Sequence, residues 1–259
     1  MQTVDRPVKA SDDLPTCKVL GLPLSRLSFR DSIRFIERLA QRGDGAIVIT
    51  APLHYAMLCK QYPGLQDVNR EAAMIVADGM PLVWLSRIKR QPIAERVAGS
   101  DLFPALCSLA HRHRKSVFLL GAAPGVADAA AKRLIELYPG LQIAGVECPD
   151  MSALSSEEEQ ALVDRIRRSN AGFLFFARGQ PAGEIWLAKH RSQLGCICLQ
   201  IGASIDFVAG GVRRAPRWMQ LSGTEWIYRL LQEPTRLIGR YARNAAFLIR
   251  EAPRDLLVR

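Results

Sequence analysis

Five short apolar runs, each leading into a loop with glycine, proline or polar residues, limit most strongly how this chain can fold. The runs are Ala46–Thr50, Met74–Ala77, Val117–Leu120, Gly172–Phe176 and Ile197–Ile201. Continuous apolar stretches of this length are typical of strands buried on both faces of a parallel sheet. Ligands of such sheets bind beyond the carboxyl ends of the strands. We therefore expect the loops that follow these runs to build one site.

Amphipathic segments separate the runs and predict helices. They are Phe29–Arg42, Leu102–Arg114, Val126–Leu137, Ser156–Arg168 and Glu184–Leu194. Ser28, and Ser155 or Ser156, stand where helix N-caps are expected, and acidic residues follow them. The alternation of strands and helices predicts an α/β fold with a doubly wound, mostly parallel, Rossmann-like sheet.

The composition excludes several classes of protein. The chain has 259 residues, of which 49% are hydrophobic, so it can bury a full core. The alternating pair Cys196 and Cys198 lies inside an apolar run, which favours core filling over a metal site, and no metal or cofactor is expected. No apolar run is long enough to span a membrane, and residues 1–15 are polar, unlike a signal peptide. These features predict a cytoplasmic location.

The strand-helix alternation ends at Gly210 and Gly211, and a basic segment follows. We expect residues 1–212 to form an α/β catalytic domain, with residues 1–15 flexible, and residues 213–259 to form a helical appendage. The appendage holds ten arginines and four acidic residues, in a chain of net charge +10. Such a cluster indicates an anionic partner.

Helical spacing separates the side chains of this appendage into two groups. Five arginines share one face: Arg229, Arg236, Arg240, Arg243 and Arg250. Five residues share the other: Leu237, Ile238, Tyr241, Ala245 and Leu248. Phe247 does not fit this pattern, and Pro234 is a point where the helix can break. A basic amphipathic helix of this kind can lie on an anionic membrane; alternatively, its apolar face docks on the domain and the arginines are solvated.

Asp78 is the strongest candidate for a catalytic group. It follows the run Met74–Ala77 and precedes Gly79, where a ligand can approach the backbone closely. A partly desolvated aspartate is suited to general-base catalysis. The alternative is an aspartate that caps a helix beginning near Pro81.

The other loops give weaker signals. The turn Gly121–Val126 can hold a phosphate on free backbone N–H groups, or it is a plain strand-to-helix turn. Glu184 can bind a sugar or ribose hydroxyl or complement a helix dipole, and Asp206 can cap its own turn. No D-x-D pair, G-x-S-x-G or H-E-x-x-H motif occurs.

Four ordered stretches resemble the WecG/TagA/CpsF glycosyltransferase family, glycosyltransferase family 26, from about Val19 to the C-terminus. They are Ala77–Trp84 with Glu95–Asp101, Phe118–Val126, Gly202–Gly210, and Arg214–Gln220 with Gly223–Pro234. The resemblance implies an inverting, metal-independent enzyme that transfers a sugar from a UDP-sugar to a polyprenyl-diphosphate-linked sugar in surface polysaccharide synthesis. It also implies peripheral association with the inner face of the cell membrane, through the appendage.

The resemblance assigns roles to individual residues. Asp78 falls on the family's catalytic base and Thr50 on a donor-site threonine. Together with the loop residues, the expected substrate-binding set is Thr50, His54, Gly79, Arg96, Asp101, Gly121, Pro124, Gly125, Glu184 and Asp206. The expected contacts to lipid diphosphate or membrane are Arg214, Arg217, Arg229, Arg236, Arg240 and Arg243.

Two departures from the family pattern leave the donor and acceptor open. Pro52 replaces the asparagine of a T-x-N pattern, and Ala182 and Gly183 replace the lysine and glutamine of G-x-P-K-Q-E-x-W. UDP-N-acetylmannosamine, its uronic acid, UDP-glucose and UDP-glucuronate all remain candidates, and so does a catalytically inactive scaffold. The sequence lacks the glycine fingerprint of a nicotinamide-dependent oxidoreductase, which argues against that alternative. A nucleic-acid-binding module would have aromatic residues interleaved with its basic groups, whereas the aromatic residues of the appendage fall mostly at the family's positions Trp218, Trp226 and Tyr228, so no nucleic acid is expected.

Overall fold

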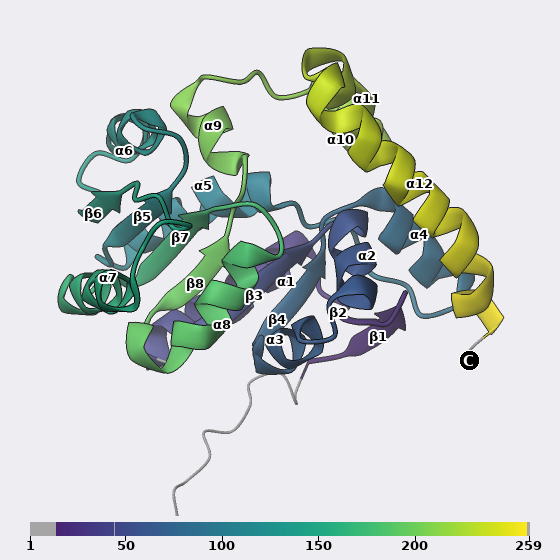
Figure 1. The fold of residues 1–259 in the computed structure, drawn as a ribbon, viewed down its shortest axis with the longest axis horizontal. Helices are drawn as coiled ribbons and strands as arrows, with labels where there is room; N and C mark the ends of the chain where they lie inside the picture. Colours follow the sequence, from purple (N-terminus) through teal and green to yellow (C-terminus); the bar gives the residue numbers. More distant parts are fainter. Residues whose placement is uncertain (1–13, 44, 258–259) are drawn as a thin grey trace, which may run out of the picture.

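The computed structural model describes residues 14–43 and 45–257, which form an α/β fold around a six-stranded parallel sheet (Figure 1). The strand order is β4-β3-β8-β7-β5-β6. Their bounds are β3 Ala46–Ala51, β4 Met74–Ala77, β5 Val117–Gly121, β6 Ile143–Glu147, β7 Phe173–Ala177 and β8 Ile197–Gln200. The predicted fold class is therefore confirmed.

All five predicted strands are present, and three further strands were missed. An antiparallel ribbon of β1 (Thr16–Val19) and β2 (Leu22–Ser25) precedes the sheet. β6 is an edge strand whose five residues are all half-buried, and Gly145 and Glu147 weaken its strand signal. Its central Gly145 lies under Phe118, whose ring leaves no room for a Cβ atom.

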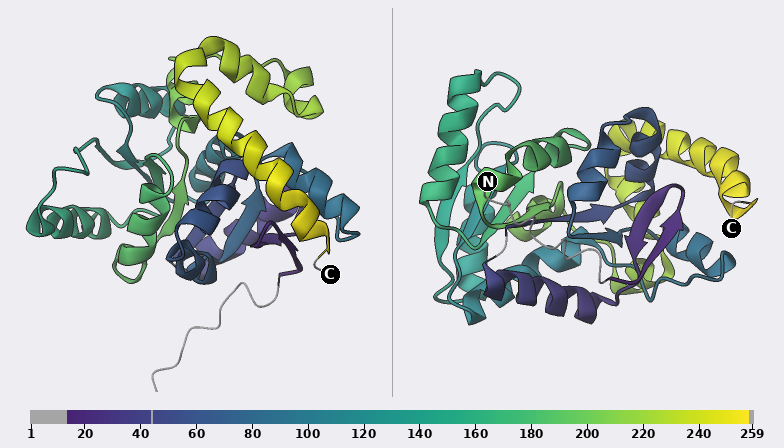
Figure 2. Two further views of the ribbon diagram at one scale, coloured as in Figure 1. Left: turned by 45° about the vertical axis from the view of Figure 1, so that its right-hand side comes forward. Right: turned by 90° about the horizontal axis from the view of Figure 1, so that it is seen from below.

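Helices cover both faces of the sheet, as the right-hand view of Figure 2 shows. One core contains residues of α2 (Leu53–Gln61), α3 (Leu65–Glu71), α4 (Met80–Ile88), α7 (Ser156–Arg168) and α8 (Ala182–Leu194). The opposite core contains residues of α1 (Phe29–Arg42), α5 (Gly99–Arg112), α6 (Val126–Leu137) and α9 (Ser204–Ala209). Strand residues alternate between the two cores, so the sheet is doubly wound.

Local sequence explains where several of these helices begin. Ser28 accepts a hydrogen bond from the backbone N–H of Asp31 at the start of α1. Ser155 and Glu158 form a reciprocal capping box at the start of α7. The prediction of flexibility falls mainly on residues 1–13, which lie outside the described residues. Leu14 packs against the core, and Pro15 accepts a hydrogen bond from the N–H of Arg26.

The appendage consists of α10 (Arg217–Ser222), α11 (Glu225–Gln232) and α12 (Pro234–Leu257), and α12 packs along α2 and α4 (Figure 1). Pro234 starts α12, where a proline costs no backbone hydrogen bond. At the far end, Lys89, the residue that follows α4, has its Nζ 3.1 Å from Asp255 Oδ2 in a mostly buried ion pair. No helix in the described part of the chain is long and apolar enough to cross a membrane.

The predicted apolar face of α12 is partly wrong. Ile238 is 61% exposed and Ala245 is exposed, whereas Phe247, which did not fit the pattern, is only 3% exposed and belongs to the core. The docked face instead includes Asn244, a polar residue that carried no hydrophobic signal. Its side chain is buried, and its Oδ1 lies 3.2 Å from the ring Nδ1 of His54.

Candidate active site

Asp78 and Thr50 lie side by side at the carboxyl edge of the sheet. β3 and β4 are paired so that Ala51 lies opposite Ala77, and the N–H of Asp78 donates to the carbonyl of Ala51 at 2.9 Å. Gly99, the first residue of α5, donates its N–H to Asp78 Oδ2 at 3.0 Å. A Cβ atom at Gly99 would lie 3.0 Å from Thr50 Oγ1, so this glycine permits the close approach. Three separate segments thus meet at Asp78.

The alternative reading of Asp78 as the cap of α4 is wrong. α4 begins at Met80 after Gly79, and no side chain caps its first turn. The carboxylate is about a quarter exposed and faces α5 instead. Burial raises the pKa of Asp78 above its usual value; the N–H of Gly99 and the charge of Arg96 oppose this rise, and Glu225 and Asp101 add to it. An aspartate in this state can accept a proton.

A network of five charged side chains joins Asp78 to the appendage. Arg214 donates two hydrogen bonds to Asp101, at 2.6 and 2.9 Å. Arg96 Nη1 donates to Glu225 Oε2 at 3.0 Å and lies 3.8 Å from Asp78 Oδ1. The sequence-predicted Arg96, Asp101 and Arg214 are therefore brought together. Glu225 was missed, although an acidic residue within a strongly basic segment was a signal that could have singled it out.

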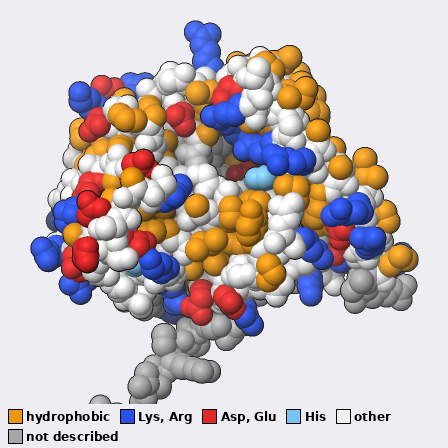
Figure 3. Space-filling view, in the orientation of Figure 1, with side chains coloured by type: hydrophobic (Ala, Val, Ile, Leu, Met, Phe, Trp, Pro, Cys, Tyr) orange, Lys and Arg blue, Asp and Glu red, His pale blue; other side chains and the backbone are white. Residues whose placement is uncertain are grey.

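Several arginines of the appendage gather near His54, at the start of α2. Burial lowers the pKa of His54, and the positive charges of Arg240 and Arg243 lower it further. Burial also lowers the pKa of Arg240, with Arg229 as a neighbouring positive charge. Figure 3 shows the hollow on this face, with Lys and Arg side chains along part of its rim. An anion placed there would relieve the repulsion among these groups.

Arg229 differs from the outer arginines in its surroundings. Its guanidinium lies 5.4 Å from the ring centre of Phe207 in α9, and its Nε is buried without a hydrogen-bond partner among the described residues. By contrast, Arg217 is exposed, Arg236 pairs with Glu233 at 2.8 Å, and Arg243 donates to the carbonyl of Gly239. The six predicted arginines thus do not form one cluster.

A second cavity of about 370 Å³ lies at the carboxyl ends of β5, β6 and β7. Its lining residues are Gly121, Ala122, Pro124, Cys148, Pro149, Asp150, Met151, Ser152, Phe176, Ala177 and Arg178. Gly121 has φ +86°, and a Cβ atom there would lie 2.5 Å from the carbonyl oxygen of Ala177, so only glycine fits. Gly121 and Pro124 were predicted, whereas Gly125 precedes α6 outside the lining. Cys148 and Asp150 were missed because β6, which they follow, was missed.

Two further predicted site residues do not line the cavity at the ends of β5, β6 and β7. Glu184 is only 1% exposed; its Oε1 accepts from Gln180 Nε2 at 2.7 Å, and its Oε2 has no partner among the described residues. Burial raises the pKa of Glu184 to about 7. Asp206 lies in the first turn of α9, where its backbone carbonyl accepts from the N–H of Gly211.

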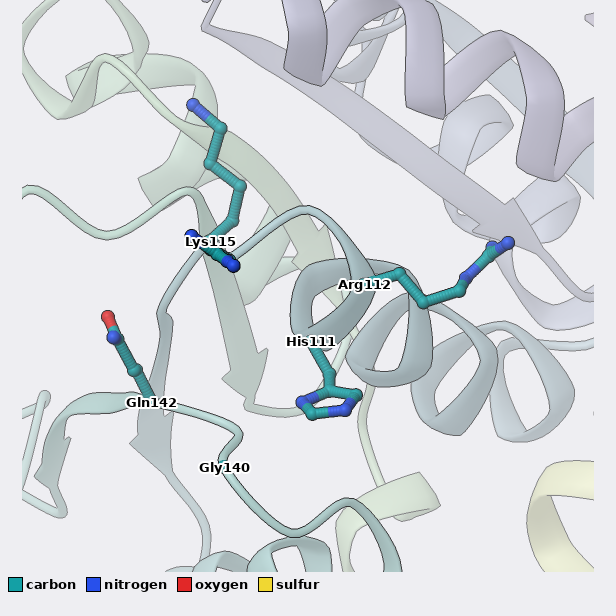
Figure 4. Close-up of a pocket in the computed structure, with 6 residues that line it drawn as sticks. His111, Arg112, Lys115, Gly140 and Gln142 are labelled. Carbon is teal, nitrogen blue, oxygen red and sulfur yellow. The ribbon is translucent and has the colours of Figure 1, made fainter.

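The opposite end of the sheet has a cavity of about 410 Å³ that is unrelated to these groups. It lies beside His111, Arg112, Arg114, Lys115, Gly140 and Gln142. Figure 4 shows the side chains of Arg112 and Lys115 pointing away from each other, so they do not converge on a ligand. Among residues 14–43 and 45–257 there is also no group of three or more His, Cys, Asp or Glu placed to hold a metal ion. Cys196 and Cys198 are buried in the core, as predicted.

Comparison with known proteins identifies one family over most of the chain. Residues 17–257 match the family described as the glycosyl transferase WecG/TagA/CpsF family. A protein of Bacillus spizizenii, named N-acetylglucosaminyldiphosphoundecaprenol N-acetyl-beta-D-mannosaminyltransferase, is 31% identical over 221 residues, covering 83% of this chain and 84% of that protein. A protein of the same name from Staphylococcus aureus (strain MW2) is 29% identical over 237 residues, covering 90% of this chain and 91% of that protein.

Proposed function

The chain belongs to the WecG/TagA/CpsF family of glycosyl transferases, and we propose that it moves a sugar from a UDP-sugar to a sugar carried on polyprenyl diphosphate. This step belongs to the synthesis of a surface polysaccharide. The names of its relatives support the class of acceptor, because they describe transfer of N-acetylmannosamine to N-acetylglucosaminyldiphosphoundecaprenol. N-acetylmannosamine is accordingly the first donor sugar to test.

The observation that carries this proposal is the partly buried carboxylate of Asp78 beside Thr50 at the carboxyl edge of the sheet. Asp78 takes the proton from the acceptor hydroxyl as that oxygen attacks the anomeric carbon of the donor. The bond from the anomeric carbon to the diphosphate breaks, and UDP leaves with the bonding electrons. Attack from the side opposite the leaving group inverts the configuration at this carbon.

The cavity at the carboxyl ends of β5, β6 and β7 is the place we assign to the donor nucleotide. The turn into α6 supports this assignment, because Pro124 borders the cavity and the backbone groups at a helix start favour an anion through the helix dipole. We infer that these groups and an arginine meet the charge of the departing UDP, without a metal ion. Electrostatic stabilisation of this kind often supplies most of the rate enhancement.

For the lipid diphosphate of the acceptor we propose the hollow near His54, with Arg229 and Arg240. α10 and α11 expose large apolar side chains, among them Trp218, Leu221 and Leu231. Figure 3 shows apolar side chains on the side of the hollow where these helices lie in Figure 1. Exposed apolar groups next to arginines fit the interface of an anionic membrane. We propose that the protein lies peripherally on the inner face of the cell membrane through this surface.

A screen of UDP-sugars for UDP release, with and without a lipid-diphosphate-linked sugar acceptor, tests donor and reaction class together. We expect acceptor-dependent release of UDP from one donor, with turnover that persists in EDTA. Loss of turnover in EDTA and its return with Mg²⁺ would contradict the metal-free mechanism. Absence of acceptor-dependent release with any UDP-sugar would contradict the proposed function itself.

A further inference from the structure

Glu225 stands between two arginines that come from different parts of the chain. It is the first residue of α11, and its side chain is mostly buried. Arg96, from the segment before α5, donates to its Oε2 at 3.0 Å, and Arg214, from the segment before α10, reaches its Oε1 at 3.5 Å. Two charged donors therefore hold this carboxylate in one place.

Arg96 has three carboxylates within reach but forms a short contact with only one. Its Nη1 is 3.0 Å from Glu225 and 3.8 Å from Asp78, and its Nη2 is 3.9 Å from Asp101. A separation of 3.8 Å exceeds the length of a hydrogen bond. Arg96 is thus bonded to the appendage, while Asp78 feels its charge without a close ion pair.

The position of the Arg96 guanidinium affects how well Asp78 can act as a base. A guanidinium closed on a carboxylate occupies its lone pairs and stabilises its ionised form, which weakens it as a proton acceptor. We propose that Glu225 is a positioning residue for Asp78: it holds Arg96 on the appendage and so leaves the catalytic carboxylate free to accept the proton of the acceptor. This proposal rests on the proposed function, in which Asp78 is the base.

The charges around Asp78 predict a measurable consequence. The groups that face it are Arg96, Glu225 and Asp101, together with the N–H of Gly99. In Glu225→Gln, a negative charge that raises the pKa of Asp78 is lost, and Arg96 is released toward Asp78; both changes lower that pKa. The acid limb of the pH profile of kcat/KM should therefore move down by about one pH unit, and the plateau should fall several-fold.

Two variants control for effects of structure and of net charge. Glu225→Asp keeps the negative charge, so its acid limb should stay closer to wild type than that of Glu225→Gln. Glu136→Gln changes the net charge equally at an exposed pair with Arg133 on α6, and it should leave the profile unchanged. If Glu225→Gln is not folded by circular dichroism, Arg96→Gln takes its place. Its acid limb should rise, because Asp78 loses a positive charge that lies 3.8 Å from its Oδ1.

The outcomes separate this inference from the function on which it rests. If Asp78→Asn keeps wild-type turnover, the base assignment fails regardless of Glu225. If Asp78→Asn is inactive but Glu225→Gln keeps the wild-type acid limb, the positioning role is overturned. It is also overturned if Glu225→Gln and Glu225→Asp lose the same activity and neither shifts the acid limb of the pH profile. An acid limb of Arg96→Gln that did not rise would also overturn it, since the position of Arg96 would then have no effect on Asp78.

Discussion

Replacing Phe247 by alanine tests whether α12 is part of the core or a detachable appendage. The side chain of Phe247 is 3% exposed and packs in the same hydrophobic core as residues of β3, β4 and β7. Truncating a buried phenylalanine removes its transfer free energy and leaves a cavity, which together cost about 3–5 kcal/mol. Because whole domains are stable by only about 5–15 kcal/mol, this loss would be a large part of the total.

Urea unfolding followed by circular dichroism measures the effect. Ile249, two residues along the same helix but 76% exposed, provides the matched control, and Ile249→Ala should change the free energy of unfolding by less than about 0.5 kcal/mol. Phe247→Ala should lower the midpoint of a single transition for the whole chain. If its free energy of unfolding matched that of Ile249→Ala, residues 213–259 would instead form a separable domain, and our placement of α12 in the core would be refuted.

Three further predictions concern the site, a buried carboxyl and the membrane. Asp78→Asn should lower kcat by roughly 100-fold or more with an unchanged circular dichroism spectrum, because a general base is lost; near wild-type turnover would contradict this. Because the pKa of Glu184 is raised to about 7, the wild-type protein loses stability as pH rises from about 4.5 through 7. Glu184→Gln should therefore be more stable than wild type at pH 8, by at most about 3 kcal/mol, and equally stable at pH 4. Chemical unfolding at both pH values measures this difference. The double variant Arg236→Gln with Arg243→Gln should bind anionic vesicles roughly 30-fold more weakly at low salt, as measured by co-sedimentation. Leu231→Ser should weaken this binding at low and high salt alike. Equal salt dependence in both variants would count against the proposed surface.

The central part of the fold could be predicted from sequence because its strands are buried on both faces. Burial on both sides requires continuous apolar residues, and Met74–Ala77 was located without error for that reason. β6 was missed because Gly145 and Glu147 weaken its strand signal, and because it is only half-buried at the edge of the sheet. The short helix α2 was not predicted, because Pro52 and Leu53 indicate a loop. In addition, α2 buries residues around much of its circumference instead of along one stripe, so it lacks an amphipathic pattern.

The site was predictable to the extent that it lies at strand ends. Asp78 and Thr50 follow from that rule, because parallel strands bring their carboxyl ends to one edge. Glu225 and Asn244 could not be predicted this way. They reach the site from helices far along the chain, and their partners, Arg96 and His54, are fixed only by tertiary docking. Periodicity along one helix carries no information about such partners.

The strand order has a consequence for how this chain must fold. β3 pairs with β4 on one side and with β8, the last strand of the chain, on the other, so that Ala46 lies opposite Ile197. The β3-β4 pair and the β5-β6 pair can each form early, but β7 and β8 must enter between them to complete the sheet. Pairing over such a separation is slow, and an open strand edge can associate with other chains in the meantime. During synthesis, the apolar edge of β3 therefore stays unpaired until β8 is made, when nearly four-fifths of the chain has been synthesised. A chain that stopped before β8 would be expected to aggregate.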